Sequence, residues 1–382
     1  MKIPFHKPCI NEDEIKSVTD CLAAGWLTSG SRTAAFEEEF KNYIGSRHAI
    51  AVNSATAGLH LSLIAAGCAE GDEVIIPAMT HAATAEVVRY LNARPVFVDI
   101  ERDTHCMDVS KIEEKITGRT RAIIPVHYAG QPCDLDEILS IARKHGLRVI
   151  EDAAHSLPAW YRERKIGTIG DITCFSFYAT KTLTTGEGGM ICTDDDDWAR
   201  RMRVLRLHGI SRDAWDRRNS SRLWQYDVIE AGFKYNMTDI AAAIGAQQLK
   251  KLELLWEERK RIAGRYAAAF RGRDEFIPYR IRPDRISSWH LYPVDLNLEM
   301  LSIGRDELIE EMGARGVDLS VHFIPLYEFS YYKRLGYSGL GLDNCAWVFK
   351  RTVSLPIFPG MTDGEADYVI ENLLDIAGKR KK

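Results

Sequence analysis

The sequence of 382 residues contains no long apolar segment. A membrane-spanning helix needs roughly 20 consecutive apolar residues, and no run in this chain approaches that length. The first 14 residues also lack the apolar core of a signal peptide. These two absences predict a cytosolic protein that does not enter a membrane.

Excess positive charge is absent as well. The formal net charge is -4, and no stretch is basic enough, or placed as a separate helix-turn-helix, to bind nucleic acid. The sequence therefore gives no electrostatic reason to expect a nucleic acid or an anionic membrane as a partner. Any anionic ligand must be held by local groups.

Motifs for metal and nucleotide-loop chemistry are missing too. The chain has no His-Glu-x-x-His, and no glycine is followed at P-loop spacing by Gly-Lys. Its cysteines lack Cys-x-x-Cys spacing and mostly lie in apolar contexts, which indicates reduced packing thiols and not zinc ligands or disulfides. They are Cys9, Cys21, Cys68, Cys106, Cys133, Cys174, Cys192 and Cys345.

What the chain does contain is the material for a large core and two domains. Short, nearly continuous apolar runs alternate with amphipathic stretches such as 58–67 and 134–146, a pattern typical of parallel strands joined by crossover helices. The last two strands lack a long helix between them, which predicts one antiparallel member. The expected strands are residues 48–53, 73–77, 95–100, 121–126, 148–152, 172–177 and 189–194.

The pattern of predicted strands and helices changes in the C-terminal third of the chain. Helices are expected at 196–208 and at 238–263, the second long enough to link two domains. We place a large domain at 1–255 and a small α+β domain at 256–382. The small domain is expected to have strands at 287–296, 316–324 and 351–358 and helices at 304–314 and 363–377, and the polar stretch 212–224 is expected to be a loop that covers a site.

Four unusual stretches follow strands of the predicted parallel sheet, at the edge where such sheets bind ligands. In the first, Ser54, Ala55, Thr56 and Ala57 open a helix. Free backbone N–H groups and a hydroxyl at a helix N-terminus form a seat for a phosphate. The alternative is a plain Ser/Thr N-cap.

The second stretch places Asp152 at the end of a strand in the middle of the sheet. A carboxylate there is costly unless it meets a cation or a donor, so it is either a ligand contact, an N-cap or one half of an ion pair. His155, three residues later, is either a donor to a ligand or a satisfied core histidine.

In the third stretch Ser176 ends a strand, and Lys181 follows in a segment rich in threonine and glycine. A lysine beside a dry sheet end can have its pKa lowered, which makes the amine nucleophilic toward carbonyls. The alternative is an ordinary surface lysine. In the fourth stretch Thr80 and the flat ring of His81 reach the same edge, unless His81 simply starts an exposed helix.

A phosphate seat, a carboxylate, a flat ring and a lysine at one sheet edge fit one cofactor, pyridoxal 5'-phosphate (PLP). The lysine would carry the cofactor, the helix terminus would hold its phosphate, the carboxylate would keep the pyridine nitrogen protonated and the flat ring would stack on the pyridine. The small residues of the loop then leave space for the cofactor.

Several longer motifs closely resemble the DegT/DnrJ/EryC1/StrS family of nucleotide-sugar aminotransferases. The resemblance runs nearly end to end and implies the PLP fold of aspartate aminotransferase, fold type I, with a mostly parallel seven-stranded sheet. Within the family it is most similar to the branch that makes UDP-4-amino-4-deoxy-L-arabinose or other 4-amino sugars. The motifs are "NSATAGLHLSL", "EGDEVIIPAMTHAAT", "AIIPVHYAGQPCDLD", "VIEDAAHS", "SFYATKTLTTGEGGM" and "GFKYNMTDIAAAIG".

Carried over residue by residue, the resemblance implies that Lys181 is the Schiff-base lysine and proton shuttle, and that Asp152 is the partner of the ring nitrogen. Ala55, Thr56 and Ser176 would hold the phosphate.

The remaining implied contacts involve the ring, the sugar and a second subunit. His155 would bond near the phenolic oxygen of the ring. Asn236 of a neighbouring subunit, or Lys234, would reach the phosphate, and Thr28 and His322 would contact the sugar. His81 stands where the family usually has Trp, Phe or Tyr, so its stacking is expected to be weaker and pH-sensitive.

The sequence therefore predicts a homodimeric PLP-dependent aminotransferase with shared active sites. It would move an amino group from L-glutamate, giving 2-oxoglutarate, to the keto carbon of a nucleotide-linked sugar. One alternative is a PLP-dependent sugar dehydratase of the same fold, but such relatives have His where this chain has Lys181. The other is a non-catalytic sensor, which predicts a lost lysine or an added DNA-binding module.

Overall fold

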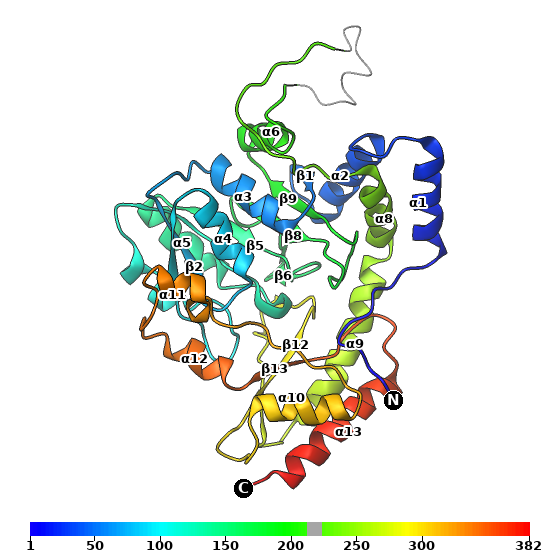
Figure 1. The fold of residues 1–382 in the computed structure, drawn as a ribbon, viewed down its shortest axis with the longest axis vertical. Helices are drawn as coiled ribbons and strands as arrows, with labels where there is room; N and C mark the ends of the chain where they lie inside the picture. Colours follow the sequence, from blue (N-terminus) through cyan, green and yellow to red (C-terminus); the bar gives the residue numbers. More distant parts are fainter. Residues whose placement is uncertain (212–223) are drawn as a thin grey trace.

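A seven-stranded sheet forms the centre of the computed structural model, which describes residues 1–211 and 224–382 (Figure 1). The strand order is β1-β9-β8-β5-β4-β2-β3. In this sheet β9 alone runs against its neighbours, as predicted. The strands are β1 (His48–Val52), β2 (Glu73–Pro77), β3 (Arg94–Val98), β4 (Thr120–Ile123), β5 (Arg148–Asp152), β8 (Ile172–Ser176) and β9 (Gly189–Thr193).

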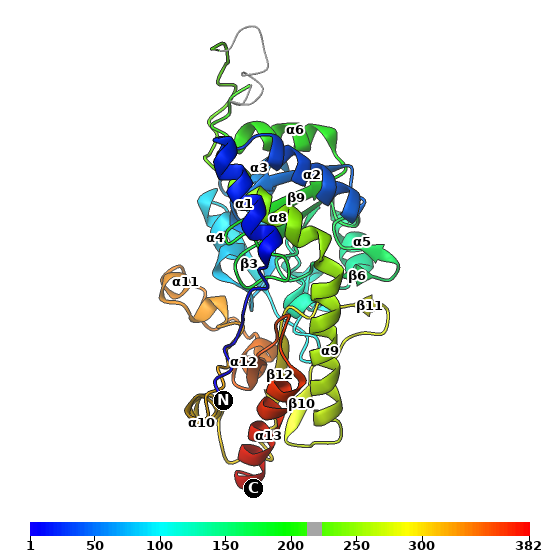
Figure 2. The same cartoon turned by 90° about the vertical axis from the view of Figure 1, so that its right-hand side faces the viewer.

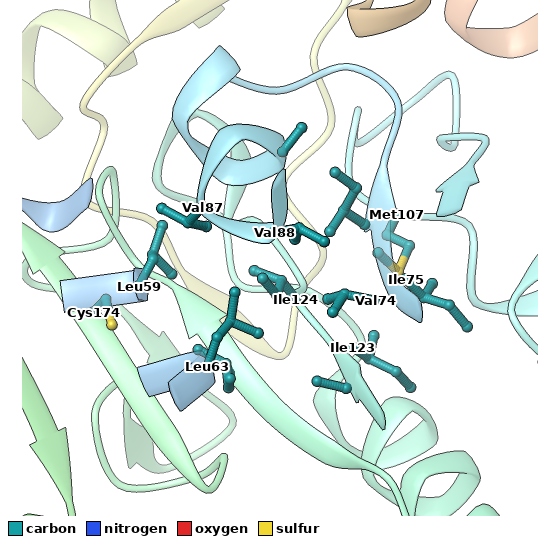
Figure 3. Packing of buried hydrophobic residues seen from close by; sticks show 14 of the residues in the cluster. Leu59, Leu63, Val74, Ile75, Val87, Val88, Met107, Ile123, Ile124 and Cys174 are labelled. Carbon is teal, nitrogen blue, oxygen red and sulfur yellow. The ribbon is translucent and has the colours of Figure 1, made fainter. Parts of the chain in front are cut away.

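Helices cover both faces of this sheet, so its strands are buried and apolar. On one face, side chains of α3 (Ala55–Ala65) and α4 (Ala82–Tyr90) pack onto the strands (Figure 3). Each large aliphatic side chain buried in this way stabilises the fold by roughly 1.5–3 kcal/mol. Residues in this layer include Leu59, Leu63, Val74, Ile75, Val87, Val88 and Ile123.

The single long helix predicted at 238–263 is two helices. These are α8 (Asp239–Lys250) and α9 (Leu252–Phe270), and Lys251 between them has φ -109° and ψ 10°, outside the helical region. Figure 2 shows α9 running from the large sheet toward the C-terminal strands. The predicted boundary at 255 falls inside α9 and stays a prediction.

A second sheet has the order β10-β12-β13. Its strands are β10 (Phe276–Pro278), β12 (Tyr292–Leu296) and β13 (Thr352–Leu355), flanked by α10 (Arg305–Ala314) and α13 (Asp363–Lys379). The strand predicted at 316–324 is wrong, because that segment pairs only through the isolated bridges Ile3↔Val317 and Ser320↔Ser354. The backbone partner changes after three residues, so no continuous ladder forms.

The other described elements surround these two sheets. A small third sheet has the order β11-β6-β7. None of the helices in the described ranges is long and apolar enough to cross a bilayer. The predicted loop 212–224 lies outside the described residues apart from Trp224. The remaining α-helices and strands of the described residues are α1 (Glu12–Ala24), α2 (Ser31–Ile44), α5 (Leu135–His145), α6 (Asp196–Leu205), α11 (Ser330–Arg334), α12 (Asp343–Phe349), β6 (Trp160–Tyr161), β7 (Arg164–Lys165) and β11 (Arg285–Ile286).

Candidate active site

A cavity of about 390 Å³ opens at the carboxyl ends of the parallel strands. This is the edge at which open α/β sheets bind ligands. Most of the residues predicted from the sequence line it, namely Ala55, Thr56, His81, Asp152, His155, Ser176, Lys181 and His322.

The N-terminus of α3 forms one wall of the cavity. Ser54 is the N-cap, and its Oγ accepts a hydrogen bond from the Ala57 amide at 3.1 Å. The amides of Ala55 and Thr56 lie in the first turn, where backbone N–H groups have no intrahelical acceptor. Strand β9 approaches this turn so closely that a Cβ on Gly189 would lie 2.7 Å from the Ala55 nitrogen. The wall therefore offers donors to an anion. The role of Ala55 and Thr56 in holding a phosphate stays a prediction.

Asp152 ends the central strand β5 and is 5% exposed. Its Oδ2 accepts a hydrogen bond from Thr84 Oγ1 at 2.9 Å, and its Oδ1 accepts one from the Ala154 amide at 3.2 Å. The Thr84 hydroxyl is in turn 3.0 Å from Thr80 Oγ1. These contacts fix the carboxylate at the cavity without placing a cation against it, so it can serve a ligand.

Lys181 follows a tight turn in which its amide donates to the Tyr178 carbonyl at 2.9 Å. Its amine lies in the cavity, 3.3 Å from His290 Nε2. Burial lowers the pKa of Lys181 to about 8. The nearby Arg259 cation also lowers this pKa, whereas the negative charge of Asp152 raises it. About a tenth of the amine is therefore uncharged at pH 7, far more than for an ordinary lysine, and the neutral form is the nucleophile.

Aromatic rings line part of the cavity. His155 stacks on Phe323 with centroids 5.8 Å apart, and His81 meets the same ring edge-on at 6.0 Å. His81 is the N-cap of α4, and its Nδ1 accepts from the Ala83 amide. His322 Nδ1 lies 2.9 Å from Ser354 Oγ.

Two histidines of the cavity, His155 and His322, are held uncharged. Burial lowers the pKa of His322 to about 3, and burial with the charges of Lys181, His322 and His81 lowers the pKa of His155 well below its usual range. A neutral imidazole can accept or donate a hydrogen bond, so each can bind polar ligand groups without bringing a second cation.

Three predicted residues do not line this cavity. Asn236 donates from Nδ2 to Ser29 Oγ at 2.7 Å, and Lys234 pairs with Leu207 in an isolated bridge. The Thr28 carbonyl accepts from the Asp239 amide. The predicted contact of Asn236 or Lys234 across a subunit interface, and the predicted contact of Thr28 with the sugar, stay predictions.

Sequence reasoning missed His290, Arg259 and Thr84. His290 and Thr84 have no motif that sets them apart from core residues of a strand or helix. Arg259 is fully buried in α9, and its guanidinium donates to the carbonyls of His290 and Ile357. Its position was a usable signal, because Arg259 falls at helical spacing on the apolar face of α9, between Trp256 and Ile262.

The fold and the cavity together define a PLP-dependent enzyme of the aspartate aminotransferase fold type. The chain belongs to the DegT/DnrJ/EryC1/StrS aminotransferase family, whose model matches residues 8–374.

Similar proteins support this class. Protein MJ1066 of Methanocaldococcus jannaschii is 50% identical over 380 residues, which are 99% of this chain and 98% of that protein. The spore coat polysaccharide biosynthesis protein SpsC of Bacillus subtilis is 45% identical over 376 residues, 98% of this chain and 97% of SpsC.

Solved structures of Spr1654 from Streptococcus pneumoniae, described as a sugar aminotransferase, match over 99% of this chain. The form with pyridoxamine phosphate (PMP) has a TM-score of 0.94 at 34% identity and is covered completely. The PLP form has a TM-score of 0.93 at 33% identity and is covered to 99%. This chain is therefore a PLP-dependent sugar aminotransferase.

The residues present fit PLP on the geometry alone. The cavity brings together the open amides of Ala55 and Thr56, a partly satisfied carboxylate on Asp152 and the amine of Lys181. Nδ1 of His155 is buried and has no hydrogen-bond partner within the described residues, so it can bond a polar group of a ligand.

Proposed function

We propose that this enzyme transfers the amino group of L-glutamate to the keto carbon, at C4, of a nucleotide-linked sugar, with a UDP-4-keto-pentose as the favoured acceptor. The observation that carries the proposal is the amine of Lys181 inside a cavity with Asp152 and the α3 N-terminus. The name of SpsC adds support, because it assigns that relative to polysaccharide biosynthesis.

The residues of the chain divide the work in the following way. Ala55, Thr56 and Ser176 hold the phosphate of PLP, and Asp152 bonds the protonated ring nitrogen. When bound, PLP supplies an electron sink for the charge that develops at the Cα of the amino donor.

Lys181 then moves the proton. Its uncharged amine takes the proton from the Cα of glutamate. The second half-reaction runs in reverse, so Lys181 then delivers a proton to C4 of the sugar, which carries none as a keto carbon, while the amine is transferred. Proton transfer by a positioned base contributes roughly 10²–10⁴-fold. The neutral histidines His155 and His322 hold polar groups of the ligands without competing for that proton.

The same lysine argues against the alternative of a sugar dehydratase, in which a histidine would take its place. The non-catalytic sensor is disfavoured because the lysine is present and its amine faces the cavity. A cytoplasmic location is supported by eight cysteines that are all free thiols.

We also propose that the enzyme is a homodimer in which Asn236, with Lys234 as the alternative, reaches the phosphate of the partner's cofactor. Two observations support it. Asn236 and Thr28 lie apart from the cavity of their own chain. An apolar groove beside α1 and the segment before it exposes Ile10 and Ile15, by 46% and 53%, as an interface would require.

A spectrum tests the first half-reaction. The purified protein is expected to absorb near about 420 nm, and L-glutamate is expected to shift the band toward about 330 nm. Lys181→Ala is expected to show no shift, while Lys260→Ala, an exposed lysine of α9, behaves as the wild type. The amino sugar formed from UDP-4-keto-pentose is then sought by mass spectrometry, and a shift without this product would reject the acceptor alone.

Complementation tests the shared site. Mixing and refolding inactive Lys181→Ala with inactive Asn236→Ala is expected to restore about a quarter of wild-type activity, because half of the dimers are hybrids with one intact site. If activity does not recover, the same experiment is repeated with Lys181→Ala and Lys234→Ala. Recovery in this second mixture would assign the contact to Lys234, and failure of both mixtures would contradict the shared site.

A further inference from the structure

Lys181 and His290 approach each other from distant parts of the chain. Lys181 lies in the loop between β8 and β9, and His290 precedes β12 of the second sheet by two residues. Their side-chain nitrogens, Nζ and Nε2, are 3.3 Å apart although 109 residues separate the two in sequence. The contact thus joins the reacting amine to the segment that leads into β12 of the second sheet.

His290 is built into its position as an uncharged ring. It is 6% exposed, and its centroid lies 4.4 Å from that of His155. Burial, with the charges of Lys181, His155, Arg259 and His322, lowers the pKa of His290 well below its usual range. A neutral imidazole carries one N–H and one lone pair, so it can accept a hydrogen bond from an amine.

A buried arginine sets the distance between the two nitrogens. Arg259 donates from Nη1 to the His290 carbonyl at 3.1 Å and from Nη2 to the Thr180 carbonyl at 3.4 Å. Thr180 immediately precedes Lys181, so one rigid guanidinium ties the backbone of both contacting residues. The contact is therefore fixed by the fold and does not depend on two free side chains.

We propose that His290 is a positioning residue for Lys181, whose ε-amine donates an N–H to Nε2 of the imidazole. The imidazole proton then resides on Nδ1. An amine nitrogen has one lone pair, so donating an N–H to His290 leaves that lone pair free for the carbonyl or proton that the reaction presents. This role belongs to the sugar aminotransferase reaction as such and does not depend on which sugar or donor is used.

The inference predicts how the charge state of Lys181 responds when the contact is lost. The groups facing its amine are Asp152, which favours the ammonium form, and Arg259, which opposes it. His155, His290 and His322 border the same cavity as uncharged rings, and His6, likewise uncharged, bonds the Ala179 carbonyl nearby. A hydrogen bond to His290 stabilises the ammonium more than the amine, so its removal lowers the pKa of Lys181.

Two matched amides test this in the cofactor-free protein. In His290→Gln the side-chain amide reaches the position of Nε2 and can still accept, whereas in His290→Asn it is too short. Reductive methylation of Lys181 with formaldehyde, followed over pH by mass spectrometry of its peptide, reports the fraction of neutral amine.

His290→Asn is expected to move the midpoint of labelling from about pH 8 to lower pH, by roughly tenfold in proton concentration. His290→Gln is expected to stay close to the wild type. Equal midpoints in all three proteins, or equal shifts in both variants, would overturn the proposal.

The holoenzyme gives a second readout. His290→Asn is expected to lower kcat by 10- to 100-fold and to leave KM for the amino donor within about threefold of the wild type. The substrate-binding groups are intact in this variant, but the amine of Lys181 is less well positioned to react. A rise in KM with kcat unchanged would show that His290 binds substrate and does not position the lysine. Since labelling needs no substrate, a wrong assignment of the sugar would leave the first test intact.

Discussion

His105 and Asp295 form a buried pair between the large and small sheets. His105 Nε2 lies 2.9 Å from Asp295 Oδ2, and the side chains are 1% and 4% exposed. The second nitrogen of His105 and the second oxygen of Asp295 have no partner in the described part of the chain. Tyr128 packs beside the histidine with centroids 5.1 Å apart and donates from its hydroxyl to the His322 carbonyl at 2.5 Å. Through Tyr128, the pair is thus connected to the backbone of His322, whose side chain lines the cavity.

Breaking this pair on one side is expected to destabilise the protein more than removing both groups. His105→Phe leaves the carboxylate buried without a partner, and we expect the free energy of unfolding to fall by about 3–5 kcal/mol. The double variant with Asp295→Leu is expected to lose less than His105→Phe alone, and therefore less than the two single variants combined. Urea denaturation of the four proteins gives the coupling energy. Additive losses would show that the two groups do not interact.

Removal of the Tyr128 hydroxyl tests the link from this pair to the cavity. Tyr128→Phe keeps the ring and loses the hydrogen bond to the His322 carbonyl, which is worth about 1 kcal/mol. We expect a small loss of stability and a rise in KM for the sugar acceptor, while the half-reaction with the amino donor keeps its rate. A slower donor half-reaction would mean that this segment acts on Lys181 and not on the sugar.

The large sheet could be predicted because its strands carry their own signal. Runs such as 73–77 and 148–152 are short, apolar on both faces and separated by helix-length stretches, and this pattern indicates parallel strands before any partner is known. The same topology brings Asp152 and Lys181 to one edge of the sheet. The ends of the predicted strands therefore sufficed to predict that these two side chains lie close together.

The rest depended on contacts that no local pattern encodes. The segment 316–324 has the alternation of a strand, but the N-terminal Ile3 pairs with Val317 while β13 pairs with Ser320. His290 falls inside the strand predicted at 287–296, where it resembles any strand residue, whereas the structure starts β12 at Tyr292 and places His290 before it. Asn236 would meet its predicted ligand only across an interface with a second copy.

Gly189 tests the phosphate seat. A Cβ at this position would lie 2.7 Å from the Ala55 nitrogen, a distance that real side chains do not adopt, so Gly189→Ala must push β9 away from the first turn of α3. We expect PLP to dissociate at least tenfold more readily, measured by equilibrium dialysis. Gly313→Ala in α10, where a Cβ meets nothing within 4 Å, is the matched control and is expected to stabilise the fold by about 0.5–1 kcal/mol. Unchanged PLP affinity in Gly189→Ala would place the phosphate elsewhere.

The neutral histidines of the cavity make the protein sensitive to mild acid. The pKa of His322 is lowered to about 3, and those of His155 and His290 lie well below the usual range, all chiefly through burial. In the unfolded chain each imidazole titrates near about 6.5. Below that pH the unfolded state binds protons that the folded state does not, so stability falls as pH decreases from about 6.5.

At pH 5.5 each of these histidines is expected to cost about 1.4 kcal/mol relative to pH 7.5. Lys181 affects stability in a different pH range, because its pKa is lowered to about 8 in the folded protein. Its contribution to the free energy of unfolding rises with pH only between about 8 and 10.4. Denaturation curves at pH 7.5 and 5.5 measure the loss for the wild type and for His322→Phe, in which one of the three contributions is missing. A loss that is the same in both proteins would show that His322 takes up a proton in the folded state, and the cavity would then carry a second cation beside Lys181.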